Sequence, residues 1–414
     1  MTIIINILKR LGQTNDKKNI MTEAKDLFYD SEFQNKLDSN PYLLGCKNGV
    51  FDFKEDIFRK GQPEDYLTKC TNIDYNDIKS KKHDGVMEEI HKFMAELFPC
   101  ENLRKYMWEH LASTLIGVAS VNQTFTNYIG IGANGKSVLT DLMSRTLGEY
   151  KGSAPISMIT QARGKIGGLS PEVAALKGLR YVVMQEPSKG DMIQEGPMKE
   201  LVSGVEPITA RGLFQDITTF VPQFKLVVCA NIFMGCKSQD HGTWRRIHVA
   251  MFQSLFTDNP VNDDPDKPYQ FKIDRYLTEK FEVWSETFLA MLVDVARRTK
   301  GVVGECAEVM EASNAYRERQ DYLAEFIRDK VEASAGSIIR KSQLSEEFKV
   351  WYNVNYGTRS PSTKDLHEYM DKRFGKQKAG VWSGVKLKFH VEQDEEADAN
   401  QYLNNEDNDP IHEI

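Results

Sequence analysis

Long apolar runs are missing from this sequence. None approaches the ~18 consecutive apolar residues that a membrane-spanning helix requires, which excludes a helical membrane protein. Residues 1–8 are apolar, but they are too few for a signal peptide and lack a small-residue cleavage site, so we expect a helix or a strand there. With 414 residues, of which 41% are hydrophobic and 27% charged, the composition predicts a soluble intracellular protein of two or three domains without a membrane partner.

Cysteine is scarce and scattered. The six cysteines form no Cys-x-x-Cys pair, so their spacing offers neither a zinc site nor a disulfide framework. We expect reduced, structural thiols in a cytosol-like compartment.

Basic residues are absent from residues 392–414, which contain nine acidic residues. This composition predicts a disordered tail that aids solubility, mimics DNA or docks a partner. Because the whole chain has a net charge of −7, leaving out these nine acids gives +2 for the remainder. The acidic balance therefore does not exclude a body that binds nucleic acid.

A phosphate-binding motif is the strongest signal that the sequence does contain. Residues 130–137 have the Gly-x4-Gly-Lys-Ser spacing of a P-loop, and a predicted strand (124–129) and helix (138–147) flank it. Glycines let the backbone approach a phosphate, and the N–H groups at the helix start favour an anion. Unless the match is a chance one, we expect ATP to bind at Gly130, Gly132, Ala133, Asn134, Gly135, Lys136, Ser137 and Val138.

The same motif and a second strand supply the expected catalytic groups. Lys136 should reach the β- and γ-phosphates, and Ser137 should hold Mg²⁺. The apolar run 179–187 ends in Glu186, which we expect to orient water or act as general base and to lie near the metal. The preceding residue is Gln185 rather than a second acid, so metal contact would rest on Ser137, phosphate oxygens and waters. The alternative is that Glu186 is a solvent-facing acid at a strand end.

Two further strands end or begin with polar groups that suit the same chemistry. The buried strand 224–231 ends in Asn231, which would sit beside the γ-phosphate and help to place the attacking water. Arg245 and Arg246 precede the strand 247–252. Either arginine could neutralise transition-state charge on a neighbouring subunit's nucleotide, or both could form surface salt bridges. Between these strands, residues 208–214 and 217–221 predict a β-hairpin.

Taken in order, these motifs resemble those of superfamily 3 helicases. The set GIGANGKS, YVVMQEP, MKELVSGVEPITARGLF, FKLVVCAN and GTWRRIHVAMF is similar to the helicase half of the poxvirus-type primase-helicases of large DNA viruses, phages and plasmids. The leading segment NPYLLGCKNGVFDF resembles the small module that precedes that helicase. The resemblance covers roughly residues 20–390. It implies an α/β fold with an AAA+-type P-loop core, and an ATP-dependent DNA helicase that forms a hexameric ring around single-stranded DNA in the host cytoplasm or nucleus.

The resemblance also implies roles for particular residues. Lys136, Ser137, Glu186 and Asn231 match the family's P-loop, second-motif and sensor residues, while either Arg245 or Arg246 matches the arginine finger. The hairpin matches the one that projects into the ring channel, although it lacks the lysine-histidine tip of related hairpins. Its candidates for DNA contact are Arg211, Phe214 and Gln215.

We expect a mostly helical N-terminal module with a hairpin (1–121), the helicase core (122–258), a helical extension (259–319), a winged-helix-like domain (320–391) and the acidic tail (392–414). The pattern in 320–391 is helix, short strand (337–339), two helices and a hairpin (379–391), with a basic edge that could contact DNA or remain solvated. No primase domain is present, so priming would belong to a removed segment or to another protein. Two other functions remain open: a packaging or remodelling AAA+ motor, and an initiator or loader that does not unwind DNA.

Overall fold

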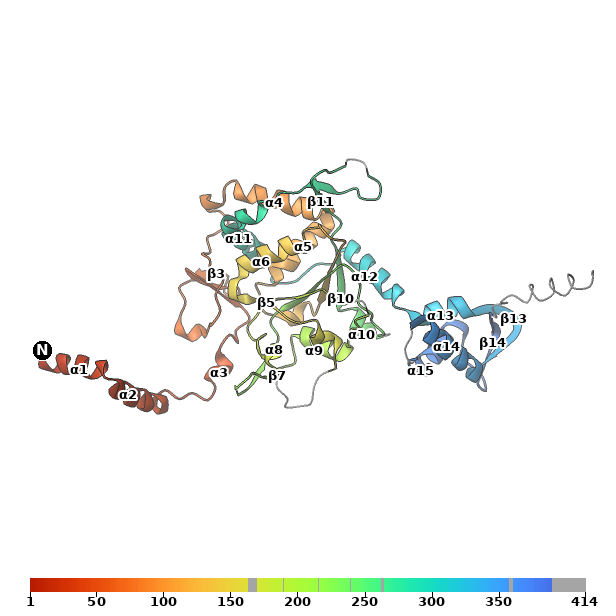
Figure 1. Cartoon of the computed structure of the whole chain (residues 1–414), viewed down its shortest axis with the longest axis horizontal. Coiled ribbons are helices and arrows are strands. Elements are labelled where there is room, and N and C mark those ends of the chain that lie inside the picture. Colours follow the sequence, from red (N-terminus) through yellow and green to blue (C-terminus); the bar gives the residue numbers. More distant parts are fainter. Residues whose placement is uncertain are drawn as a thin grey trace, which may run out of the picture. The chain divides into compact units, whose positions relative to one another are not determined.

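The computed structural model describes residues 1–162, 170–188, 190–214, 216–238, 240–261, 264–356 and 360–388. It divides into two compact units, Met1–Glu318 and Arg319–Ile414. Figure 1 shows the elements of both units in sequence colours.

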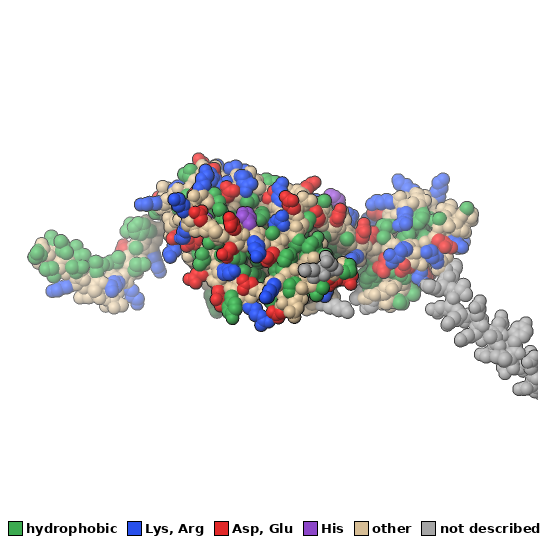
Figure 2. All heavy atoms as spheres, turned by 90° about the horizontal axis from the view of Figure 1, so that it is seen from above, with side chains coloured by type: hydrophobic (Ala, Val, Ile, Leu, Met, Phe, Trp, Pro, Cys, Tyr) green, Lys and Arg blue, Asp and Glu red, His purple; other side chains and the backbone are tan. Residues whose placement is uncertain are grey.

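The first unit begins with helices and a small antiparallel sheet. Helices α1 (Thr2–Gly12), α2 (Thr14–Leu27) and α3 (Phe33–Lys36) precede strands β1 (Leu43–Cys46), β2 (Gly49–Asp52) and β3 (Ile57–Arg59). The hairpin expected in this N-terminal module is formed by β1 and β2, in which Cys46 pairs with Gly49. Helix α1 buries none of its residues, and its isoleucines give it an apolar surface (Figure 2). Helices α4 (Val86–Leu97) and α5 (Glu101–Ser113) follow, and Pro99 lies between them.

A five-stranded parallel sheet forms the centre of this unit. Its strands are β4 (Phe125–Ile129), β5 (Lys151–Ser153), β6 (Tyr181–Gln185), β9 (Lys225–Ala230) and β10 (Ile247–Met251), in the spatial order β10-β4-β9-β6-β5. Strands β4, β6 and β9 are almost wholly buried, as is typical of parallel sheets covered on both faces. The expected α/β architecture is therefore confirmed, with a sheet consistent with a P-loop core.

Two hydrophobic clusters cover the faces of this sheet. One contains residues of α4, α5, α6 (Lys136–Leu147) and α11 (Phe281–Thr299) together with Tyr128 and Val227. The other contains residues of α9 (Glu195–Ser203) and of the hairpin β7 (Ile208–Arg211) and β8 (Ile217–Phe220). The remaining elements are α7 (Ser157–Thr160), α8 (Pro171–Ala174), α10 (His241–Trp244), β11 (Leu255–Thr257), β12 (Gln270–Lys272) and α12 (Ala307–Arg319).

The second unit has its own core. It contains α13 (Tyr322–Lys330), β13 (Val331–Arg340), α14 (Lys341–Tyr356), α15 (Thr363–Phe374) and β14 (Val381–Leu387). The strand expected at 337–339 is part of the longer strand β13. The prediction of a hairpin at 379–391 is wrong for the described residues of that segment. A single strand, β14, pairs antiparallel with β13 instead. This pairing buries Trp382 and Val385 beside Ile339, and Gly384 takes a positive φ of 80° without turning the chain.

Candidate nucleotide-binding site

The P-loop turns sharply between the end of β4 and the start of α6. A Cβ atom at Gly130 would lie 2.2 Å from Nδ2 of Asn134 and 2.5 Å from the carbonyl oxygen of Phe252. Gly135 has a φ of +83°, and a Cβ there would lie 2.4 Å from Cδ1 of Leu97. Only glycine fits both places without strain, so the loop depends on the two glycines that define its motif.

Lys136 and Asn231 come together at the carboxyl edge of the sheet. Lys136 is the first residue of α6 and is 8% exposed. Its Nζ donates hydrogen bonds to the carbonyl oxygen of Gly130 (2.5 Å) and to Oδ1 of Asn231 (3.2 Å). Asn231 follows β9, which adjoins β4, so parallel pairing explains why two positions 95 residues apart meet. Burial lowers the pKa of the Lys136 ammonium group.

The residues of this loop fit a nucleotide bound with Mg²⁺. Nδ2 of Asn134 is buried without a hydrogen-bond partner among the described residues, while Gly132, Ala133 and Ser137 are exposed. In the described part of the chain, no group of three or more His, Cys, Asp or Glu side chains could hold a metal ion. The exposed hydroxyl group of Ser137 suits Mg²⁺, which keeps several waters and is usually held by one or two side chains plus phosphate oxygens.

Glu186 follows β6 in an unusual backbone conformation. Its φ is +52°, which is uncommon for a residue with a Cβ, and its N–H donates to the carbonyl oxygen of Cys229 in β9 (3.2 Å). Strained backbone of this kind costs about 1–3 kcal/mol and is concentrated at functional sites. The side chain is exposed. Because β6 lies next to β9 in the parallel sheet, Glu186 and Asn231 follow neighbouring strands at the same edge of the sheet.

Arg245 and Arg246 lie at the opposite end of the sheet from the P-loop. The carbonyl oxygen of Arg246 accepts from the N–H of Phe125, the first residue of β4, whereas the P-loop follows the last. A five-residue strand spans about 16 Å, so neither arginine is placed beside its own chain's P-loop. Nη2 of Arg245, an exposed residue, donates to Oε1 of Gln123 (3.1 Å). Arg246 is half-buried, and its Nη1 donates to the carbonyl oxygen of Gly242 (2.6 Å).

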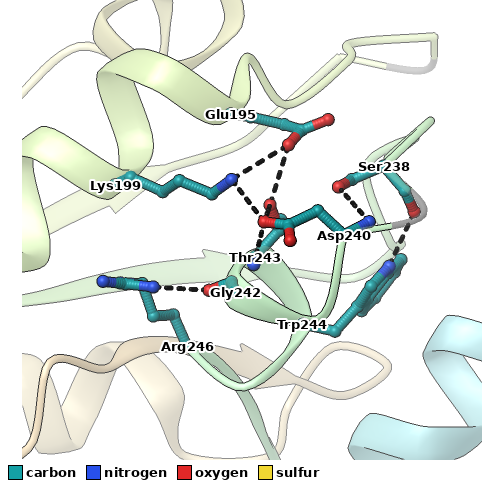
Figure 3. A network of polar contacts seen from close by, with 8 residues as sticks. All are labelled: Glu195, Lys199, Ser238, Asp240, Gly242, Thr243, Trp244 and Arg246. Atoms are coloured by element: carbon teal, nitrogen blue, oxygen red, sulfur yellow. Dashed lines mark hydrogen bonds and ion pairs between the residues drawn. The ribbon is translucent and has the colours of Figure 1, made fainter.

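A polar network that the sequence analysis missed holds the segment before these arginines (Figure 3). Nζ of Lys199, on α9, bonds to Oδ2 of Asp240 (2.6 Å) and to Oε2 of Glu195 (3.1 Å). Oγ1 of Thr243 donates to the same oxygen of Glu195 (2.9 Å), and the N–H of Thr243 donates to Asp240 (3.1 Å). The hydrogen bond from Lys199 lowers the pKa of Asp240 to about 2, so this carboxylate stays ionised at neutral pH.

The hairpin β7–β8 presents an apolar tip. Its base is buried at Ile208 and Phe220, whereas Leu213 is 58% and Phe214 98% exposed. Phe214 also has a positive φ of 55°. Arg211 is exposed at the end of β7, where its N–H donates to Oγ of Ser170 (3.2 Å). Gln215, the third predicted DNA contact, lies outside the described residues.

Comparison with known proteins shows that the chain is similar to viral proteins. Residues 4–99 match the family model described as D5 N terminal like. Over 89% of its length the chain is 33% identical to "Putative helicase L207/L206" of Acanthamoeba polyphaga mimivirus. The chain therefore contains a D5 N terminal like segment and is similar to viral proteins named putative helicases. It is also 26% identical to "Putative helicase 022R" of Frog virus 3 (isolate Goorha), over 92% of its length.

The chain spans less than half the length of these relatives. It covers 39% of the mimivirus protein and 46% of the Frog virus 3 protein. It is 26% identical, over 86% of its length, to "Putative primase C962R" of African swine fever virus (strain Badajoz 1971 Vero-adapted), of which it covers 38%. A solved apo structure of the NrS-1 C-terminal region aligns with 63% of this chain and 57% of that chain, at 13% identity. Its TM-score of 0.42 is too low to establish a fold.

None of the helices among the described residues is both long enough and apolar enough to cross a membrane.

Proposed function

We propose that this chain is an ATP-dependent DNA helicase or translocase that works as a ring of subunits. The resemblance to superfamily 3 helicases suggests that the ring is a hexamer. The observation that carries the proposal is the separation of the catalytic groups. Lys136 and Asn231 meet at one end of the sheet, whereas Arg245 and Arg246 lie at the other. A complete site therefore needs an arginine from a second subunit, which a ring supplies at every interface.

Within one subunit, each polar group of the site has a distinct task. Lys136, which is held by Gly130 and Asn231, would exchange these partners for the β- and γ-phosphates of ATP. Ser137, phosphate oxygens and waters would hold Mg²⁺, which would neutralise charge on the phosphates, with Glu186 nearby. Asn231 would orient the attacking water, and Glu186 would accept its proton.

The hairpin is the proposed DNA grip. Phe214 offers an exposed aromatic face on which a base can stack, and Arg211 offers a positive charge for a phosphate. Gln215 completes the proposed contact set. Movement of the hairpins during hydrolysis would draw one strand through the channel. This feature favours a DNA motor over a packaging or remodelling AAA+ motor.

We also infer that the second unit is a winged-helix-like module with a DNA-binding edge. Helix α15 buries Leu366 and Met370 against the core of this unit. The basic side chains on and after this helix are exposed, which suits contact with phosphates. They are Lys364, Lys372, Arg373, Lys376 and Lys378.

The substitution Glu186→Gln tests whether ATP is hydrolysed or serves only for assembly. It keeps the size of the side chain and removes the proton acceptor, so we expect ATP binding to persist while hydrolysis falls by about 10²–10⁴-fold. Nucleotide titration and phosphate release measure the two effects. Wild-type chain that binds ATP and DNA without hydrolysing ATP would instead support the initiator or loader.

A further inference from the structure

A pocket lies on the outer side of the edge strand β10. It has a volume of about 320 Å³ and is bounded by α10, β10, α12 and the segment before α12. This volume falls within the ~300–1,000 Å³ typical of sites for small molecules, and it is too small for a helix or a strand of a partner. No residue of the P-loop lines it.

The floor of the pocket is polar and neutral. Tyr106 is buried on α5, and its hydroxyl group lies 2.9 Å from Nδ1 of His248 on β10. Burial lowers the pKa of His248, which favours the uncharged imidazole. A neutral imidazole beside a hydroxyl group can both donate and accept hydrogen bonds, as the ring nitrogens and exocyclic groups of a nucleobase require.

The walls of the pocket are apolar. The apolar lining residues include Trp244 of α10, Ile247 of β10, and Val309 and Met310 of α12. A flat ring between these side chains would be removed from water and would pack against the indole of Trp244. The walls therefore suit the planar part of a ligand.

The mouth of the pocket is cationic. Arg245, His241 and Arg317 are all exposed lining residues, while Glu305 is the acid among the residues that line the pocket. Arg317 lies on α12 seven residues after Met310, which places both on the same face of the helix. Guanidinium groups that line one pocket favour an oxyanion such as a phosphate or a carboxylate.

We propose that this pocket binds a nucleoside monophosphate, with the base among the apolar walls and the phosphate at Arg245 and Arg317. The same chemistry is offered by a free nucleotide and by the phosphorylated end of a DNA strand. Arg245 is also the proposed finger, so a bound phosphate would withhold it from a neighbouring subunit. This last consequence alone rests on the proposed function.

Calorimetric titration of the full-length chain tests the site directly. The Lys136→Ala variant removes the P-loop's phosphate contact, and the ligands are 2′-deoxyadenosine monophosphate and a short single strand with a 5′-phosphate. We expect one of them to bind this variant. Adding Arg317→Ala should weaken that binding by roughly tenfold to a hundredfold, because a hydrogen bond to a charged group is lost. The ligand that binds identifies the source of the nucleotide.

Two further variants make the test specific to the pocket. Asn314 is an exposed lining residue on α12, so Asn314→Trp should fill the pocket and abolish binding. Arg319→Ala removes the same charge from the same helix but outside the pocket, and it should leave the affinity unchanged. The proposal is overturned if neither ligand binds the Lys136→Ala chain, or if affinity survives Arg317→Ala or Asn314→Trp. These titrations need no hydrolysis, so their failure would leave the proposed helicase untouched.

Discussion

Lys225, the first residue of β9, has its side-chain ammonium group inside the core of the first unit. It is 3% exposed, and its Nζ has no hydrogen-bond partner among the described residues. Burial, and then the charge of Arg180, lower its pKa from 10.5 to about 8. Arg180 is buried as well, but its guanidinium donates to the carbonyl oxygens of Pro41 and Leu43. The cost of burial is therefore offset for Arg180 and remains largely uncompensated for Lys225.

This imbalance predicts that Lys225→Met stabilises the protein at pH 7, by on the order of 1–3 kcal/mol. The folded chain binds fewer protons than the unfolded chain between about pH 8 and 10.5, so Lys225 makes the unfolding free energy rise with pH across this window. The variant should lose this contribution. Urea unfolding of both proteins at pH 7 and pH 10 measures the difference. A variant that is less stable than the wild type at pH 7 would refute the argument.

The two adjacent arginines differ in exposure, which predicts different effects of substitution. Arg245→Ala should leave ATP binding intact and lower kcat by at least about a hundredfold, since a finger is worth 10³–10⁵ in rate. Arg246→Ala removes the bond to the Gly242 carbonyl and should mainly lower stability, by about 1 kcal/mol. Steady-state kinetics and thermal unfolding separate the two results. If Arg246→Ala alone abolishes turnover in a folded protein, the assignments are reversed.

At the scale of elements, the sequence predicted the parts that depend on local pattern. The strand before the P-loop, the helix after it and the hairpin β7–β8 are confirmed, because glycines and alternating apolar residues define them within a few positions. The pairing of β14 with β13 was missed because it joins residues that are 41 (Arg340 and Val381) to 56 (Val331 and Leu387) positions apart in the chain. No local pattern reports a partner so distant in sequence.

The contacts within the candidate site could not be predicted from local sequence patterns either. Sequence order could not show that Lys136 contacts Asn231, or that Arg245 lies at the other end of the sheet, because both depend on the strand order. The bonds of Lys199 to Asp240 and Glu195 were missed for the same reason, since charged residues on a short helix look like a solvated face. Glu186, Gln215 and the other proposed site residues stay predictions until substitutions test them.

The tip of the hairpin β7–β8 leads to a prediction about DNA binding. Phe214→Ala should weaken binding of single-stranded DNA by ~1–3 kcal/mol, because one stacking face is lost, and it should leave ATP binding unchanged. Fluorescence anisotropy with a labelled oligonucleotide measures the change. Tyr276, a 69% exposed aromatic residue in another segment, provides a matched control in Tyr276→Ala. Equal affinities for wild type and Phe214→Ala would remove the hairpin from the proposed DNA contacts.

At the scale of the whole molecule, the proposed ring would share each active site between subunits. One chain holds Lys136 and Asn231 at one end of its sheet and the arginines at the other, so under the proposed mechanism an isolated subunit would lack the arginine that its site needs. Hydrolysis should therefore depend on assembly, and DNA should promote assembly if it occupies the channel of a ring.

The most direct test is the rate of ATP hydrolysis per subunit, measured against protein concentration with and without single-stranded DNA. We predict that the specific activity rises steeply with concentration, that DNA shifts this rise to lower concentrations, and that adding the Arg245→Ala chain to wild type suppresses the rate. A constant specific activity that DNA does not change would contradict the account, because it would show a self-contained nucleotide hydrolase.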